Sequence, residues 1–250
     1  MQVTSDVLSV LSQATFRGNT MTIDIQLDRN LYTRTNKIVE AAGGVWSRKA
    51  KAHVFDGAAE DAIDLVLLTG TVDKKADPKK IYGFFPTPAE LAKRMVAMAG
   101  VEPGMHVCEP QAGTGRIARA AADRGALVTC YEIQPDLAHA LKSEGTFHDV
   151  VHGDFLNVPP APIFDAIIAN PPFALQADIK HTLHAMKFLK PGAPLVTVLS
   201  AGIQYRKTKL ASELRDLVAR TGGTIEDLPE GSFKESGTNV RTVLVTLYNK

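Results

Sequence analysis

From residue 105 onward, short apolar segments alternate with longer segments of helical periodicity. Five of the apolar segments read as strands: Met105–Glu109, Leu127–Glu132, Val150–Gly153, Phe164–Ala169 and Pro194–Leu199. Repeated strand–helix units build a parallel sheet with helices on both faces, because each right-handed crossover returns the chain in the same direction. The sequence therefore predicts an α/β fold with a doubly wound, mostly parallel sheet. In such a sheet, ligands bind beyond the carboxyl ends of the strands.

The remaining segments of this part predict the helices and one further pair of strands. Helices are expected up to Ala122, from Pro135, across Leu175–Leu189 and across Leu210–Val218. A final strand over Arg241–Leu247 is expected to pair with Thr224–Leu228. Another helix is expected after Thr87, with Pro88 at its first position and Glu90 completing a capping box.

The first 70 residues predict a separate, smaller α+β domain. The expected elements are a short helix around residues 7–11, a strand over Met21–Leu27, a helix capped by Asp28, a strand-like stretch over Val45–Phe55 and a helix over Ala58–Leu68. The polar segment Thr71–Lys80 is typical of a linker. We therefore expect a small domain over residues 1–70, a linker over 71–80 and a larger domain over 81–250.

Composition limits the classes of partner. The chain of 250 residues carries 28 Lys and Arg against 27 Asp and Glu, a net charge of +1, so any nucleic-acid binding must use a local basic patch. Its two cysteines, Cys108 and Cys130, exclude a disulfide framework and a four-cysteine zinc site. No metal is expected, because no Cys or further acid pair joins His181 and His184 at ligand spacing. No membrane partner is expected, since no apolar run approaches the roughly 20 residues of a membrane span. We expect a cytoplasmic protein.

A glycine-containing turn follows the first strand of the larger domain. Gly113 and Gly115 let the backbone turn tightly and approach a ligand. Glu132 ends the next strand, where an acid can accept hydrogen bonds from both hydroxyls of a ribose. This pattern alone also fits a dinucleotide site, because Gly113–Ala118 matches G-x-G-x-x-A.

Three further features favour S-adenosyl-L-methionine over a dinucleotide. A carboxylate at Glu109 repels a pyrophosphate and attracts the ammonium of an amino acid. Asp154 ends the third strand, where it can accept from an adenine amino group. The turn over Phe84–Pro88 offers free N–H groups at a helix N-terminus, which suit a carboxylate.

The tetrapeptide Asn170-Pro171-Pro172-Phe173 directly follows the most apolar strand. An amino group conjugated to a ring is a poor nucleophile, and two acceptors aimed at its N–H bonds localise its lone pair. The Asn170 side-chain oxygen and the Pro171 carbonyl can supply those acceptors, with prolines fixing the backbone. Phe173 offers a face for stacking a planar group. The alternative is a simple strand-ending turn.

Two basic segments are candidates for nucleic-acid contacts. Trp46, Arg48, Lys49 and Lys51 combine an aromatic ring with three positive charges, which suits base stacking and phosphate contact. The competing interpretation is an edge strand protected by charges, with Trp46 in the core. Arg206 and Lys207 follow the fifth strand, at the edge where the active site is expected, which favours a substrate contact over a solvated turn.

Across residues 81–250, this order of motifs resembles the amino-directed S-adenosylmethionine methyltransferases of class I, Rossmann-like fold, and in particular the N6-adenine DNA methyltransferases. The resemblance implies transfer of a methyl group to N6 of a flipped adenine, with a restriction-modification or orphan role of phage or mobile-element type. It implies catalytic roles for Asn170, Pro171, Pro172 and Phe173. It implies cofactor binding by Phe85, Thr87, Glu109, Pro110, Ala112, Gly113, Gly115, Glu132, Ile133, Asp154, Phe155 and Asn170. The resemblance also implies that Phe233, in a late loop over residues 232–238, lines the target pocket.

Two departures from this family leave alternatives open. Glu109-Pro110 replaces the usual Asp-Pro, and little chain remains after Phe173 for a region that reads DNA sequence. RNA methyltransferases acting on guanine N2 or adenine N6 share the Asn-Pro-Pro-aromatic motif. Protein-glutamine methyltransferases also share it, but there a tyrosine is expected at position 173. A non-catalytic DNA-binding accessory protein on the same fold is the alternative of a different class.

Overall fold

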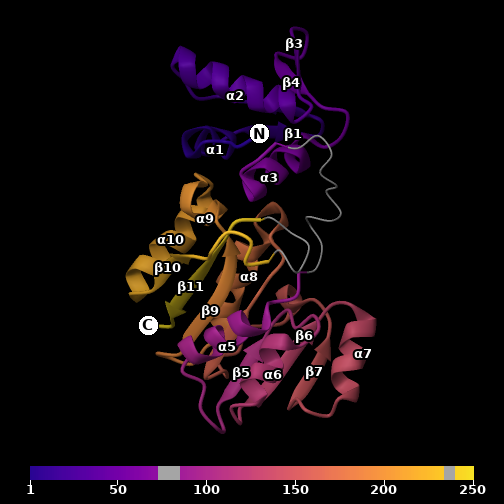
Figure 1. Ribbon diagram of the computed structural model, residues 1–250, viewed down its shortest axis with the longest axis vertical. Coiled ribbons are helices and arrows are strands. Elements are labelled where there is room, and N and C mark those ends of the chain that lie inside the picture. Colours follow the sequence, from indigo (N-terminus) through magenta and orange to yellow (C-terminus); the bar gives the residue numbers. More distant parts are fainter. Residues whose placement is uncertain (73–84, 234–239) are drawn as a thin grey trace.

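The computed structural model describes residues 1–72, 85–233 and 240–250. Two sheets organise these residues, one built before residue 72 and one after residue 85 (Figure 1). The expected linker over 71–80 lies outside the described residues from position 73 onward. Within the described ranges, no helix is both long and apolar enough to cross a membrane.

The N-terminal unit is a four-stranded antiparallel sheet with three helices. Its elements in chain order are α1 (Ser5–Leu11), β1 (Thr15–Arg17), β2 (Thr20–Thr22), α2 (Arg29–Ala41), β3 (Val45–Ser47), β4 (Ala52–Val54) and α3 (Ala59–Thr69). The strand order is β1-β2-β4-β3, so β3 is an edge strand. Side chains of α1, α2 and α3, among them Leu11, Val39 and Ile63, form the apolar core of this unit.

Two strand predictions in this unit are wrong in extent. The strand expected over Met21–Leu27 ends at Thr22, and Asp24 accepts hydrogen bonds from the hydroxyls of Thr15 and Thr22 just past it. The stretch over Val45–Phe55 is a hairpin of two strands, because Lys51 adopts a left-handed conformation (φ 52°) that reverses the chain. A period-two pattern cannot show where a turn interrupts it.

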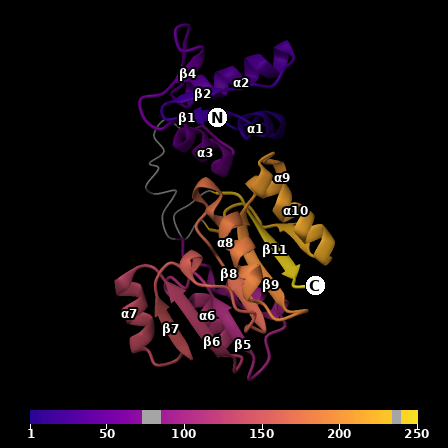
Figure 2. The ribbon, with the colours of Figure 1, turned by 180° about the vertical axis from the view of Figure 1, so that it is seen from behind.

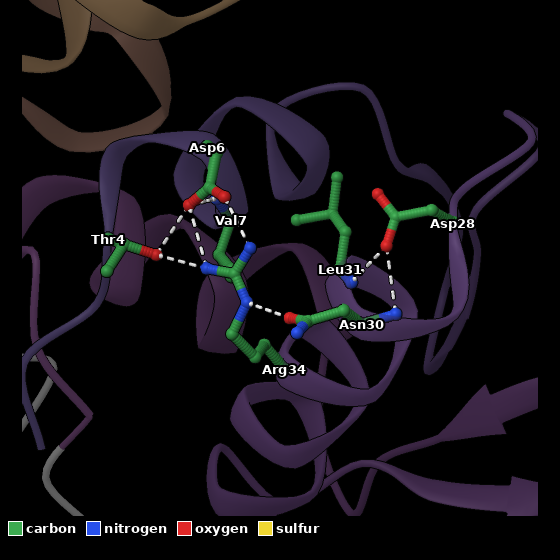
Figure 3. A network of polar contacts seen from close by, with 7 residues as sticks. All are labelled: Thr4, Asp6, Val7, Asp28, Asn30, Leu31 and Arg34. Atoms are coloured by element: carbon green, nitrogen blue, oxygen red, sulfur yellow. Dashed lines mark hydrogen bonds and ion pairs between the residues drawn. The ribbon is translucent and has the colours of Figure 1, made fainter.

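Polar contacts tie α1 to the start of α2 (Figure 3). As predicted, Asp28 caps α2, because its carboxylate accepts from the backbone N–H groups of Asn30 and Leu31 at 2.9 and 3.0 Å. Arg34 pairs with Asp6 of α1 at 2.5 Å and also donates to Asn30 at 2.9 Å. Since both charged side chains are nearly half exposed, this pair orients the helices more than it stabilises them.

The second sheet has seven strands in the order β10-β11-β9-β8-β5-β6-β7. The strands are β5 (His106–Glu109), β6 (Leu127–Glu132), β7 (Asp149–His152), β8 (Ala166–Ala169), β9 (Pro194–Ser200), β10 (Thr224–Asp227) and β11 (Thr242–Tyr248). The five strands from β5 to β9 are parallel, and β11 is antiparallel to both β9 and β10. The predicted α/β fold and the predicted pairing of the last two strands are confirmed.

Helices cover both faces of this sheet. They are α5 (Ala89–Met98), α6 (Arg116–Ala122), α7 (Pro135–Ser143), α8 (Ala177–Ala185), α9 (Gly202–Tyr205) and α10 (Lys209–Thr221), with short 3₁₀ turns η1 (Phe155–Asn157), η2 (Ala174–Gln176) and η3 (Met186–Phe188). Helices α5 and α6 lie on the face seen in Figure 1, and α8 and α10 on the face seen in Figure 2. Separate apolar clusters fill the two faces.

Two helix predictions need correction. The helix expected across Leu175–Leu189 is split, because Leu175 and Gln176 have left-handed backbone angles and η2 precedes α8. The capping box at α5 is also wrong. The residue before the helix is Pro88, no side chain caps it, and the Thr87 hydroxyl instead accepts a hydrogen bond from Asn170.

Gly115 is a position where the fold requires glycine. Its φ is 73°, and an added Cβ lies 2.5 Å from Cδ2 of the buried Leu141. Gly145 has a similar φ of 64° with no atom within 4 Å of the added Cβ.

We expect Gly145→Ala to cost roughly 1–2 kcal/mol from backbone strain alone. Gly115→Ala should cost about 3 kcal/mol, because overpacking adds to that strain. Urea unfolding of both variants checks this, and equal losses contradict the steric argument.

Candidate active site

A cavity of about 290 Å³ opens at the carboxyl ends of β5, β6, β7 and β8. Most of the residues that line it follow these four strands in turn, as expected for a doubly wound sheet, while Phe85 precedes α5 and His181 lies on α8. Ten of the residues singled out from the sequence lie on its wall: Phe85, Pro110, Glu132, Ile133, Asp154, Phe155, Asn170, Pro171, Pro172 and Phe173. Residues from one predicted strand end after another therefore meet around one space.

The turn between β5 and α6 is held by the Glu132 carboxylate. Gly113 and Gly115 have φ values of 54° and 73°, which are strained for residues with a Cβ. The Gly113 N–H donates to Oε2 of Glu132 at 2.6 Å, and the Gln134 N–H donates to Oε1 at 2.8 Å. Each oxygen keeps further lone-pair capacity, so Glu132 can hold the turn and accept from a ligand at the same time.

Glu109 does not lie on the cavity, which corrects its expected contact with an ammonium group. Its side chain is buried, and Oε2 accepts from the backbone N–H of Ala118 in α6 at 2.7 Å. Burial raises the pKa of this carboxyl well above its usual range, so the folded state favours the uncharged form. Glu109 therefore fastens α6 to β5.

Asn170 has the most distinctive environment in the cavity wall. Its Nδ2 donates to the carbonyl of Phe85 at 2.9 Å and to Oγ1 of Thr87 at 3.1 Å. These two acceptors fix the orientation of the amide. Its Oδ1 is buried and has no hydrogen-bond partner. A buried acceptor without a partner is costly, so its position on a cavity wall marks a place where a ligand can donate.

The segment before α5 therefore has a different role from the predicted one. We expected its N–H groups to bind a carboxylate, with Phe84 at its start outside the described residues. The structure instead uses the Phe85 carbonyl and the buried Thr87 hydroxyl to support Asn170. Arg116 of α6 donates to the Thr87 carbonyl at 3.1 Å, which holds the same segment from the other side.

Aromatic rings lie behind the Asn-Pro-Pro-Phe segment. Phe173 is buried on the cavity wall, and its ring meets that of Phe233 edge to face, with centroids 6.4 Å apart. Phe233 is itself fully buried and packs behind Phe173, not on the cavity wall. The rest of the late loop, residues 234–238, lies outside the described residues.

Four cavity residues were missed by sequence reasoning: Gln111, Gln134, Gly153 and His181. Three of them adjoin predicted strand ends, so their position along the chain could have indicated them. His181 lies on α8, and its Nδ1 is 2.9 Å from Nε2 of Gln111. Burial lowers the pKa of His181, which favours the neutral ring. Among the described residues, no group of three or more His, Cys, Asp or Glu could hold a metal.

The expected substrate contact at Arg206 is wrong. Its side chain is 3% exposed and pairs with Asp64 of α3 at 2.6 Å. A charge that is buried and paired cannot meet a phosphate in solution. Lys207 is exposed, and its backbone N–H donates to the Ser12 hydroxyl of the N-terminal unit. This segment therefore joins the two units. The position of Arg206 in the chain could not reveal its pairing, because its partner Asp64 lies 142 residues away in the sequence.

The other basic segment is at the surface. Trp46 is 51% exposed, so the interpretation that placed it in the core is wrong. Its ring meets His53 edge to face at 5.1 Å, and His53 contacts Oδ1 of Asn36 at 2.8 Å. The turn of the β3–β4 hairpin carries Arg48, Lys49 and Lys51, all exposed. The β3–β4 hairpin thus presents three exposed cations and the Trp46 indole, which packs on His53.

Sequence comparison finds relatives among rRNA methyltransferases, and no protein-family model matches the chain. Ribosomal RNA small subunit methyltransferase A of Mycobacterium sp. (strain KMS) is 30% identical over 170 residues, which are 66% of this chain and 55% of that protein. The rRNA adenine N-6-methyltransferase of Saccharopolyspora erythraea is 35% identical over 89 residues, 34% of this chain and 23% of the relative. The chain thus spans about half the length of the first relative, and less of the second.

Structural comparison covers more of the chain. A Listeria monocytogenes protein described as a class I S-adenosylmethionine-dependent methyltransferase matches with a TM-score of 0.54 at 14% identity. The match includes 98% of this chain and 79% of that one. Identity at this level shows the fold alone. The strand order, the glycine turn after the first parallel strand and this match agree: the chain has the class I S-adenosylmethionine-dependent methyltransferase fold, with rRNA methyltransferases among its sequence relatives.

Proposed function

We propose that this protein transfers a methyl group from S-adenosyl-L-methionine to the exocyclic N6 amino group of adenine in nucleic acid. The observation that carries the proposal is the buried Oδ1 of Asn170, which has no partner in the protein although the amide is fixed by two hydrogen bonds. An adenine amino group has N–H donors that fit such an acceptor. The aromatic Phe173 in the same wall suits a flipped base.

The cavity residues fit the cofactor. Glu132 has acceptor capacity for the ribose hydroxyls, and Asp154 stands at the end of the neighbouring strand for an adenine amino group. Ile133, Phe155 and Pro172 give the same wall apolar surface for a purine ring. When bound, S-adenosyl-L-methionine supplies an electrophilic methyl group on a sulfonium.

The chain's own contribution is to orient the amine. Asn170 Oδ1 and the Pro171 carbonyl accept from the two N–H bonds, which draws the nitrogen toward tetrahedral geometry and localises its lone pair. The localised lone pair would then be available to the electrophilic methyl group that S-adenosyl-L-methionine supplies when bound, and the proton that the amine loses would go to solvent. Because no strong base is required, catalysis depends mainly on positioning and on acceptors fixed in place.

The polymer that carries the adenine has two candidates. The order of motifs and the Asn-Pro-Pro-Phe segment resemble the adenine-N6 DNA methyltransferases, which supports DNA. The sequence relatives are named as rRNA methyltransferases, and one is named as an adenine N-6 enzyme, which supports RNA as the second candidate. The exposed indole and cations of the β3–β4 hairpin suit either polymer, since stacking and phosphate contact are common to both.

Methyl transfer is tested directly with nucleosides as the readout. The purified protein is incubated with S-adenosyl-L-methionine and, separately, unmethylated genomic DNA and total RNA, and digests are examined by mass spectrometry. We expect N6-methyladenine in one polymer. Asn170→Ala should abolish it, with turnover falling by about a thousandfold, while the Kd for S-adenosyl-L-methionine changes by less than about threefold. Absence of product in both polymers, or full activity of the variant, contradicts the proposal.

Two buried acids provide a matched pair for the cofactor site. Glu132→Gln should weaken binding of S-adenosyl-L-methionine by about tenfold or more, because an acceptor at the ribose position becomes a donor. Glu109→Gln should change the affinity by less than about twofold, because this side chain does not reach the cavity and glutamine keeps an oxygen for the Ala118 N–H. Calorimetry measures both. If Glu109→Gln weakens binding of S-adenosyl-L-methionine and Glu132→Gln does not, the roles assigned to the two acids are contradicted.

The hairpin is tested through the salt dependence of binding. If Arg48, Lys49 and Lys51 contact phosphates, each change to Gln should lower the slope of log K against log[salt] by about one. Trp46→Ala should weaken binding with little change in slope, because stacking is not ionic. Lys142→Gln, at an exposed position on α7, is the control. Equal slopes for the hairpin variants and the wild type exclude phosphate contact there.

A further inference from the structure

A buried carboxylate of the N-terminal unit reaches the segment that follows the Asn-Pro-Pro-Phe motif. Asp64 of α3 is 3% exposed. Its Oδ1 accepts from Nη2 of Arg206 at 2.6 Å, and its Oδ2 accepts from the backbone N–H of Leu175 at 2.8 Å. One side chain therefore connects α3, the segment after β9 and the start of η2.

The backbone that Asp64 holds is in an unfavourable conformation. Leu175 and Gln176 have φ values of 49° and 60°, and Lys51 is the one other non-glycine residue with positive φ in the described parts of the chain. Two consecutive left-handed residues with side chains persist only where neighbouring groups hold them. Leu175 is held by Asp64, and Oε1 of Gln176 accepts from the Thr208 hydroxyl at 2.5 Å.

Apolar packing joins the same elements. Leu68 of α3 is fully buried in the cluster that contains Phe173 and Phe233, although it belongs to the N-terminal unit. In return, Tyr205 of α9 packs on the core of the N-terminal unit, and its hydroxyl donates to the Leu67 carbonyl. Figures 1 and 2 both place α3 beside α9. Helix α3 thus contributes a side chain to the core cluster of the larger unit that also contains the aromatic ring of the motif.

We infer that Asp64 is a positioning residue for the Asn-Pro-Pro-Phe motif, so the N-terminal unit helps to shape the active site as well as offering a surface to nucleic acid. Leu175 is two residues beyond Phe173, and fixing its N–H fixes where the chain leaves the cavity wall. Arg206 holds the carboxylate in place through Nη2, while its Nε has no hydrogen-bond partner among the described residues. The inference rests on the proposed function for its effect on turnover.

The test separates the hydrogen bond to Leu175 from the stability of the interface. The double variant Asp64→Leu with Arg206→Met replaces the buried ion pair by apolar groups, which commonly preserves folding, but leaves the Leu175 N–H without an acceptor. The conservative control pairs Asp64→Asn with Arg206→Met, because the amide oxygen can accept from Leu175 and no buried cation is left unpaired. Tyr205→Phe is the matched control, because it removes a hydrogen bond of the same interface and leaves Leu175 untouched.

Hydrogen exchange of the full chain gives a readout that does not depend on activity. In the double variant, exchange of the Leu175 amide should rise at least about tenfold, and exchange over 170–177 should rise with it, while β5 and β6 keep wild-type rates. The conservative control and Tyr205→Phe should keep protection over 170–177 within about threefold of the wild type. Unchanged protection in the double variant overturns the inference, whatever the enzyme does.

Turnover gives the second readout. For the double variant, kcat for methyl transfer should fall by about a hundredfold, since a small misplacement of a positioning segment has effects of that size. The Kd for S-adenosyl-L-methionine should stay within about threefold. Altered exchange with a normal kcat refutes the positioning role. If the wild type transfers no methyl group, the proposed function fails while the exchange result still decides whether Asp64 holds the segment.

Discussion

The amide of Asn170 is the point on which the arrangement of the cavity depends. Its Nδ2 binds the Phe85 carbonyl and the Thr87 hydroxyl, which fastens the segment before α5 to the end of β8. The same two bonds leave Oδ1 as a buried acceptor that has no partner among the described residues and belongs to the cavity wall. One side chain therefore holds the fold here and, under the proposed function, accepts from the amine. Any change that lets the amide rotate releases the segment before α5. The same change also turns Oδ1 away from its present direction.

Buried carboxylates in this protein act mainly on the backbone. Glu109 accepts from Ala118, Glu132 from Gly113 and Gln134, and Asp64 from Leu175, each at a place where the chain turns or a helix begins. Asp178 of α8 belongs to the same group, since it accepts from Ser200 and Ile179, and burial raises its pKa to about 6. Backbone N–H groups at turns need acceptors, and carboxylates supply them where no strand can. At Glu132, which lines the cavity, the lone pairs of the carboxylate oxygens that the backbone bonds leave free can accept hydrogen bonds from a ligand.

The sheet and most of its strand ends could be predicted from the sequence, because a buried parallel strand is a continuous apolar run and its end is marked by polar or glycine residues. Asn170, Glu132 and Asp154 were placed on the cavity in this way. Glu109 and Arg206 were also expected to contact ligands there, and both predictions are wrong, because each side chain contacts a partner that local pattern does not reveal. Arg206 looked like a surface cation, and only the fold brings Asp64 to it. The split before α8 was missed for a similar reason, since its left-handed residues are held by side chains from elsewhere.

Arg206 also changes how the two units should be understood. Pattern and composition divide the chain near residue 71, and each unit has its own sheet and apolar core. Domains joined only by a linker expose polar residues where they meet, and they move relative to one another by default. Here the contact buries an ion pair, shares Leu68 with the larger core and places Tyr205 on the smaller one. Separating the units would break the Arg206–Asp64 pair and leave the Leu175 N–H without its acceptor, so these contacts oppose movement of one unit against the other.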